Sequence, residues 1–269
     1  MSPNGQYTEL RHLGCLTGGE AWAGVVLDAA GNLYGTTEVT PPDCDNGNGP
    51  SPFGVVYELD PGGKLTVLYR FPGPPELLNN VDTGPNPGVI LDSTGNVYGA
   101  TPYSGVGGVV YELVPASGLQ TTLYSFPGAP GGTEPIAGLA RDSAGNFYGA
   151  ARSGGTLNQG TVYKLDAAGH ETVLHTFAGG SDGADPESAV VLDAAGNVYG
   201  TTVGGGVANV GVVYKVDTSG QETVLYSFTG GADGGTPNGV IVDAAGNLYG
   251  TTLFGGAGGG DWDTGGRGF

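Results

Sequence analysis

The sequence predicts an all-β fold, a five-bladed β-propeller of four-stranded antiparallel blades that is closed by an N-terminal strand. Two observations predict it. Each of five Gly-Asn-x-Tyr-Gly segments follows a short apolar run and, in the first four copies, precedes two further runs rich in Val, Tyr, Leu and Thr. N-terminal residues 4–10 align with residues 219–225, the last strand of a repeat. The five segments are residues 31–35, 95–99, 145–149, 196–200 and 246–250.

The first strand of each unit is a short apolar run followed by aspartate. Because the run is continuous rather than alternating, we expect strands that are buried on both faces between neighbouring blades. The Asp-x-x-Gly-Asn segment that follows predicts a hairpin turn, since Gly and Asn accept positive φ and the Asp side chain bonds backbone amides. The runs with their aspartates are residues 25–28, 89–92, 139–142, 190–193 and 240–243.

Three more strands complete each unit, and four antiparallel strands in about 50 residues are typical of one propeller blade. The second strand leaves the turn, as at residues 33–37 and 198–202. A Gly-rich loop leads to the third strand and a tight turn to the fourth. The expected third strands are residues 55–59, 109–113, 161–165 and 212–216, and the expected fourth strands are 66–71, 121–126, 171–177 and 222–228.

We expect residues 1–269 to form a single domain in which residues 4–13 are the closing strand. That strand would pair with the blade that contains residues 240–252 and so remove a free sheet edge. An open solenoid of hairpins, or a fragment of a larger ring, is the alternative. The repeats start near residues 22, 86, 136, 187 and 238.

Composition narrows the expected partners. The net charge is −18 and the pI is about 4.1, which disfavours nucleic acid and anionic membranes. We expect no membrane insertion, because no apolar stretch is long enough to span a bilayer. We also expect the protein to be a monomer. Residues 1–15 lack the basic-then-apolar profile of a signal peptide.

The repeat also resembles a known family. Asp-x-x-Gly-Asn-x-Tyr-Gly-Thr-Thr, Gly-x-Val-Tyr-x-Leu and Thr-Val-Leu-Tyr-Ser-Phe are similar to the bacterial Gloeo-Verruco (GloVer) tandem repeat over nearly the whole chain. The first two copies depart from it through insertions at residues 38–53 and around 72–87. The resemblance implies secreted or surface-anchored, extracytoplasmic proteins and no established activity.

Candidate site residues are those that break the repeat in the variable loops, which we expect opposite the hairpin turns. The carboxylates of Glu20, Glu134 and Glu187 are candidate ligands for calcium or another divalent metal. Glu134 and Glu187 are also candidate catalytic acid and base. Solvated loop charges are the alternative. The candidate ligand-binding residues of these loops are Glu20, Trp22, Asn86 and Asn238.

Two arginines and a second tryptophan complete the candidate site. Arg141 replaces an aliphatic residue in a first strand. We expect it to form a salt bridge to a nearby turn aspartate; the alternatives are that it acts with the catalytic carboxylates and neutralises them, or that it anchors an anionic ligand. Arg152 opens the next loop of the same unit and is a candidate anchor for a ligand. Trp262, between two aspartates, is a candidate platform for sugar stacking or a plug for a missing strand.

The two cysteines, Cys15 and Cys44, are expected to form a disulfide, because their loops emerge on the same face. Such a bond suits an extracytoplasmic protein; two free thiols are the alternative. His170 in a turn and His175 in a fourth strand are expected to be structural.

Three functions stay open at this stage, since Gly-x-Ser-x-Gly, His-Glu-x-x-His and P-loop motifs are absent. The first is binding of a small polar or carbohydrate ligand, with or without a metal. The second is hydrolysis of an ester, lactone, phosphoester or glycoside. The third is a structural role at the cell surface. Binding is the function we expect.

Overall fold

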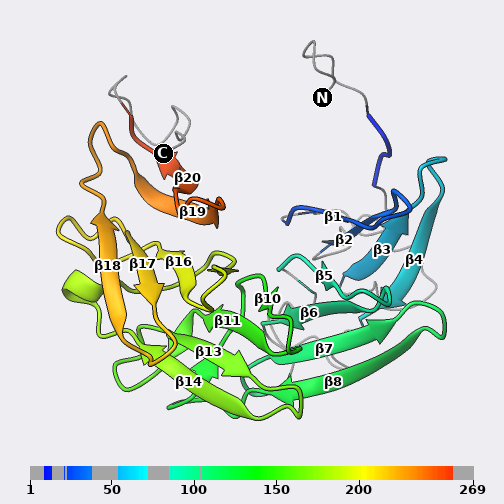
Figure 1. The fold of residues 1–269 in the computed structure, drawn as a ribbon, viewed down its shortest axis with the longest axis horizontal. Helices are drawn as coiled ribbons and strands as arrows, with labels where there is room; N and C mark the ends of the chain where they lie inside the picture. Colours follow the sequence, from blue (N-terminus) through cyan, green and yellow to red (C-terminus); the bar gives the residue numbers. More distant parts are fainter. Residues whose placement is uncertain are drawn as a thin grey trace, which may run out of the picture.

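The computed structural model describes residues 9–13, 21, 23–37, 54–71, 85, 87–102 and 105–256. Their strands form four four-stranded antiparallel sheets and a hairpin of a fifth repeat, and these residues contain no α-helix. Figure 1 shows the sheets following one another round an arc, each running from a strand near the centre to one at the rim. The predicted all-β fold of four-stranded antiparallel blades is therefore confirmed.

Each sheet corresponds to one repeat and is called a blade. Blade 1 consists of β1 (Val26–Leu27), β2 (Leu33–Thr37), β3 (Val55–Leu59) and β4 (Leu65–Arg70), and blade 2 of β5 (Ile90–Leu91), β6 (Val97–Thr101), β7 (Val109–Val114) and β8 (Leu119–Ser125). Blade 3 consists of β10 (Ala140–Arg141), β11 (Phe147–Ala151), β13 (Thr161–Leu165) and β14 (Glu171–Thr176), and blade 4 of β15 (Val191–Leu192), β16 (Val198–Thr202), β17 (Val212–Val216) and β18 (Glu222–Ser227). The fifth repeat contributes β19 (Gly235–Val242) and β20 (Leu248–Phe254); β9 (Gly132–Thr133) pairs with β12 (Ser153–Gly154), and a 3-10 turn, η2 (Gly180–Asp182), follows β14.

The hairpin turn between the first and second strands explains the repeated motif. In blade 3, Asp142 Oδ1 accepts hydrogen bonds from the backbone amides of Ala144 and Asn146, both at 2.9 Å. Its Oδ2 accepts bonds from Asn146 Nδ2 at 2.7 Å and from Tyr148 Oη at 3.2 Å. Gly145 adopts a φ of 88°, which favours glycine. The same pattern recurs around Asp28, Asp92, Asp193 and Asp243.

The last glycine of the motif makes room for a tyrosine of the third strand. Gly99 pairs with Tyr111 across β6 and β7, and a Cβ at Gly99 would lie 2.5 Å from Tyr111 Oη. The tyrosine ring therefore fills the space that any other residue would occupy. The same contact joins Gly35 to Tyr57, Gly149 to Tyr163 and Gly200 to Tyr214.

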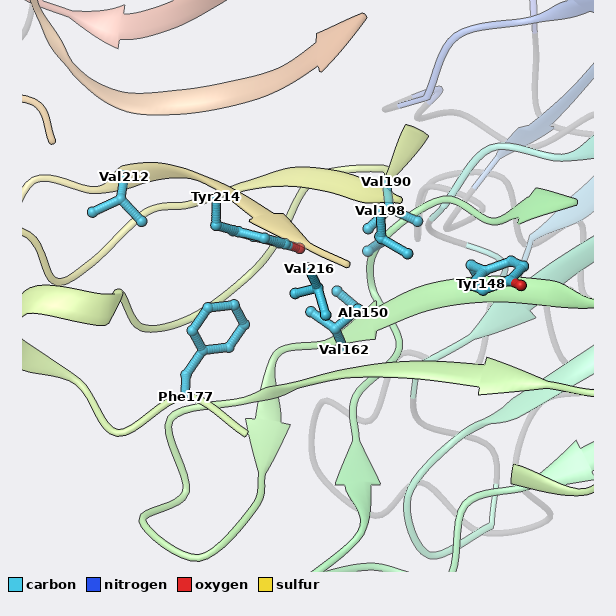
Figure 2. Packing of buried hydrophobic residues seen from close by; sticks show 10 residues of the cluster. Tyr148, Ala150, Val162, Phe177, Val190, Val198, Val212, Tyr214 and Val216 are labelled. Carbon is cyan, nitrogen blue, oxygen red and sulfur yellow. The ribbon is translucent and has the colours of Figure 1, made fainter. Parts of the chain in front are cut away.

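The core lies between neighbouring blades. Phe177, which directly follows β14, is fully buried, and its ring meets that of Tyr214 on β17 edge to face at 5.1 Å. Figure 2 shows both rings with Val198, Val212 and Val216 in the cluster between blades 3 and 4. Equivalent pairs join the preceding blades, Phe71 with Tyr111 at 5.2 Å and Phe126 with Tyr163 at 5.0 Å.

The predicted strands differ from the observed ones mainly at the centre of the arc. The first strands of blades 1 to 4 are only two residues long and half-buried or exposed, so burial on both faces was wrong for them. Only the apolar residue before each strand is deeply buried in blades 2 to 4, as at Val89, Leu139 and Val190. The physical reason is that one edge of each first strand faces the centre of the arc, where no strand follows.

Closure of the ring by residues 4–13 is not confirmed. Residues 9–13 belong to no strand, and Figure 1 shows them on the blade 1 side of the opening, away from β19 and β20. A fourth strand needs a third strand to pair with, and the described part of the last repeat ends after its second strand, β20. Residues 4–8 lie outside the described residues.

The rim strands make a second contact between blades. On β8, Tyr124 Oη donates to Glu171 Oε2 of β14 at 2.7 Å. One blade further on, His175 replaces the tyrosine, and its Nε2 lies 3.8 Å from Asp182 Oδ2. Neither His175 Nε2 nor Oε1 of Glu222, the equivalent of Glu171, has a hydrogen-bond partner among the described residues. Burial and the charge of Asp182 raise the pKa of Glu222 to about 7.

The raised pKa of Glu222 predicts a pH-dependent gain from Glu222→Gln. The folded state holds this proton more tightly than the unfolded state, so the wild type loses stability as the pH rises from about 4.5 through 7. We expect Glu222→Gln to raise the Tm at pH 8 and to leave it nearly unchanged at pH 5, measured by thermal unfolding. Glu171→Gln, whose carboxylate already accepts the Tyr124 hydroxyl, is the matched control without this gain. A gain of equal size at both pH values would contradict the prediction.

Candidate functional site

The two ends of each complete blade carry different kinds of connection between strands. The short turns that join first to second and third to fourth strands lie at one end, as at residues 142–146 and 166–170 of blade 3. The connections from second to third strand and from one blade to the next lie at the other end, since the strands are antiparallel. We call these the hairpin end and the loop end.

The loops that lead into successive blades at the loop end share an unusual backbone. Glu134, Asp185 and Thr236 have φ values of 57°, 54° and 51°, a region that non-glycine residues seldom adopt. Each precedes a buried proline that packs against the glycine before a third strand of the preceding blade. The amide of Glu134 donates to Gly107 O at 2.9 Å, and its carbonyl accepts from the amide of Arg152 at 3.0 Å. The loop is therefore tied both to blade 2 and to its own blade.

Charged side chains gather where blades 3 and 4 meet at this end. Arg152 Nε lies 3.2 Å from Glu187 Oε1, and both side chains are partly exposed. Burial raises the pKa of Glu187, Arg152 opposes that rise, and the charges of Asp185 and Glu134 add to it. The charges of two further carboxylates therefore act on the Glu187 of this ion pair. We call Arg152, Glu187, Asp185 and Glu134 the loop-end cluster.

The chemistry of the loop-end cluster suits recognition of hydroxyl groups. Carboxylates only accept hydrogen bonds and a guanidinium only donates them, so a polyol can satisfy both kinds of group. Burial also raises the pKa of Glu187 near other carboxylates, and this is the direction of shift found in carboxyl groups that act as general acids. An anionic ligand would be repelled by the excess of negative charge.

The repeat itself now decides the family. The family model described as the Gloeobacter/Verrucomicrobia repeat matches residues 1–193 and 84–262. The chain belongs to the Gloeobacter/Verrucomicrobia repeat family. The residues that repeat in this chain, Asp, Gly, Asn, Tyr and Gly, have structural roles in the turns and in the Gly–Tyr contacts, so the residues that differ between repeats are the candidates for a site. A search of curated proteins found no match.

Solved structures show the same kind of fold as this Gloeobacter/Verrucomicrobia repeat protein. A gluconolactonase from Xanthomonas campestris is 14% identical, with a TM-score of 0.51, over 85% of this chain and 68% of that chain. The extracellular domain of a putative one-component system from Bacteroides thetaiotaomicron is 14% identical, with a TM-score of 0.55, over 92% of this chain and 31% of that chain. At such identities the likeness concerns the fold alone. Within the described residues, no helix has the length and hydropathy to span a membrane.

The structure brings together only part of the predicted site. Glu187 lies beside Arg152, and the charge of Glu134 acts on Glu187, so these three predicted residues belong to the loop-end cluster. Asn238 lies on β19 and lines a pocket of about 390 Å³ beside Ala189 of blade 4. The described residues contain no group of three or more His, Cys, Asp or Glu side chains that could hold a metal. Glu20, Trp22, Asn86, Trp262, Cys15 and Cys44 lie outside the described residues.

Arg141 lies away from the carboxylates with which it was grouped. It pairs with Phe147 at one end of β11, whereas Arg152 follows the other end of that strand. Five residues at about 3.3 Å each separate the two arginines by roughly 16 Å. Arg141 is thus at the hairpin end, because it directly precedes the turn at Asp142.

Asp185 is the member of the loop-end cluster that the sequence interpretation missed. It precedes Pro186 as Glu134 precedes Pro135, and the shared left-handed backbone confirms that the two positions are equivalent. Aligning the repeats on these prolines, rather than on the apolar strands, would have found it. Glu187 is one residue beyond the proline and therefore reaches the cluster from a different backbone position.

Proposed function

We propose that this protein is an extracytoplasmic β-propeller that binds a small neutral sugar or other polyol at the loop-end cluster. The observation that carries the proposal is the half-buried Glu187, held by Arg152 at 3.2 Å and influenced by the charges of Glu134 and Asp185. These groups provide hydrogen-bond acceptors and a donor within two adjoining blades. A ring of five blades, an expected Cys15–Cys44 disulfide and a monomeric state are parts of the same proposal.

The backbone supports the proposal because it holds the cluster rigidly. Glu134 is fixed by hydrogen bonds on both sides of its peptide unit, and Pro135 and Pro186 are buried between blades. Side chains on such a frame lose little further freedom when a ligand binds. The three carboxylates of the loop-end cluster also favour a neutral ligand over an anionic one at this place.

Calorimetry with a panel of neutral saccharides tests this function. The panel contains glucose, galactose, mannose, xylose, cellobiose and maltose, each titrated in calcium chloride and again in EDTA, because calcium is the proposed metal if the carboxylates bind one. We expect at least one saccharide to bind, and Glu187→Gln to weaken that binding at least tenfold, which equals about 1.4 kcal/mol.

Glu58→Gln is the matched control, since Glu58 is a partly buried glutamate of blade 1 that is remote from blades 3 and 4. It should bind the saccharide as the wild type does. The proposal fails if no saccharide binds the wild type, or if Glu187→Gln binds as tightly as the wild type.

A second candidate function is hydrolysis of a lactone or ester at the same cluster. It is favoured by the raised pKa of Glu187 beside other carboxylates, and the fold shared with a gluconolactonase suggests the substrate class. Hydrolysis of glucono-1,5-lactone and of p-nitrophenyl acetate, followed in the wild type, Glu134→Gln and Glu187→Gln, tests it. Wild-type rates equal to those of buffer alone would exclude this function for these substrates.

A further inference from the structure

A separate pocket of about 360 Å³ lies at the hairpin end, between blades 2 and 3. Its walls come from β8 of blade 2, from Arg141 on β10 and from the turn at residues 166–169 of blade 3. The volume is in the range of pockets that take small organic molecules. None of the loop-end cluster residues lines it, so it is separate from the loop-end cluster.

Arg141 gives this pocket a positive charge that no carboxylate of the described residues pairs with. Its guanidinium carbon lies 5.4 Å from the ring centroid of Tyr98 and 5.5 Å from that of Phe147. No carboxylate of the described residues forms an ion pair with it, and no hydrogen bond within that part of the chain uses its N–H donors. The two aromatic rings therefore hold the guanidinium in place without neutralising it.

The two carboxylates that line the pocket have other partners. Glu112 Oε1 accepts hydrogen bonds from Tyr98 Oη at 2.9 Å and from Asn96 Nδ2 at 3.1 Å. Asp166 Oδ1 accepts from the amides of its own turn, at Ala168 and His170, both at 2.9 Å. Its Oδ2 lies 3.1 Å from His170 Nδ1.

The first two blades show that the arginine is not needed for packing. Blade 1 has Glu58 on β3 where blade 2 has Glu112 on β7, so both of these blades place a glutamate opposite the tyrosine of the second strand. The blade that follows blade 1 nevertheless has Leu91 in the position of Arg141. The other equivalents, Leu27, Leu192 and Val242, are aliphatic as well.

We infer that this pocket binds a small molecule that carries a carboxylate, and that Arg141 is the residue that holds the carboxylate. A planar guanidinium presents two parallel N–H donors to a carboxylate, which gives a stronger contact than neutral hydrogen bonds. The pocket has both apolar walls, such as Leu123 and Leu165, and polar ones, such as Thr122. Its ligand therefore combines the carboxylate with a small group that contacts these walls, and a sugar ring and an apolar ring are the two groups that the test compares.

Two carboxylates and their neutral analogues test the inference by calorimetry and by ligand-observed NMR. D-glucuronate and glucuronamide represent the sugar ring, and benzoate and benzamide represent the apolar ring. We expect one carboxylate to bind at least tenfold more tightly than its amide, and the pair that does so identifies the ring. Arg141→Leu, which introduces the residue found at this position in other blades, should weaken that binding at least tenfold and leave the Tm close to that of the wild type.

Two more variants make the outcome specific. Arg141→Lys keeps the charge without the planar pair of donors, so we expect intermediate affinity. Glu187→Gln should bind the carboxylate as the wild type does, whatever the result at the loop end, since the two sites lie at opposite ends of blade 3. The inference is overturned if neither carboxylate binds, if the amide binds as tightly as the acid, or if Arg141→Leu binds as the wild type does.

Discussion

Replacing Phe177 with alanine is expected to lower the free energy of unfolding by about 3–5 kcal/mol. The side chain is fully buried between blades 3 and 4 and meets the rings of Tyr214 and His175 at 5.1 and 4.8 Å. The strands of each blade are held in their sheet by backbone hydrogen bonds. The two blades therefore cannot approach each other to fill the space left by the ring, and a cavity remains. Chemical denaturation followed by circular dichroism measures the loss.

Val207→Ala is the control for this prediction, since Val207 is a large apolar residue of blade 4 that is 80% exposed. We expect a change within about 0.5 kcal/mol there. If Phe177→Ala costs no more than Val207→Ala, the packing between blades does not stabilise the fold as described.

Gly99→Ala is expected to cost about 3 kcal/mol and to lower the Tm by roughly 6–12 °C. The new Cβ would lie 2.5 Å from Tyr111 Oη and 2.7 Å from Tyr111 Cζ, so the buried ring must move within a packed interface. Differential scanning calorimetry of the variant and the wild type measures the shift in Tm.

The matched control is Gly24→Ala, because a Cβ at Gly24 meets nothing within 4 Å. That variant should unfold within a few degrees of the wild type. Equal Tm values for Gly99→Ala and Gly24→Ala would show that the Gly–Tyr contact is not the reason for the repeated glycine.

The strands that the sequence predicted correctly are those set by local chemistry. The limits of β2, β3, β13, β16 and β17 agree with the predicted ones, because the Asp-x-x-Gly-Asn turn fixes where the second strand begins and the Gly–Tyr contact fixes its pairing with the third. The fourth strands end before the predicted phenylalanine, whose side chain turns into the interface between blades.

The features that the sequence did not predict depend on packing between units. Continuous apolar runs cannot tell a strand between two blades from one whose edge lines the centre of the arc, and β1 shows the difference, with Leu27 65% exposed. The closing strand was inferred from alignment alone, which carries no information on whether a partner strand is in reach.

Only part of the candidate site was predicted, because the rest also depends on how the units are arranged in space. Glu134 and Glu187 were found as exceptions to the repeat in loops that lead into blades, and such loops do meet at one end. Arg141 was also an exception, but its position at the end of a two-residue strand places it at the hairpin end. Grouping exceptions by charge, without their position along the strand, joined two separate places.

Hydrogen exchange measured by mass spectrometry, with and without the tightest-binding saccharide of the panel, tests the central proposal most directly. Binding at the loop-end cluster predicts slower exchange at residues 131–138, 152–160 and 184–189, and unchanged exchange in the turns at 142–146 and 166–169. Protection confined to those turns, or no saccharide-dependent protection in any part of the chain, would contradict it.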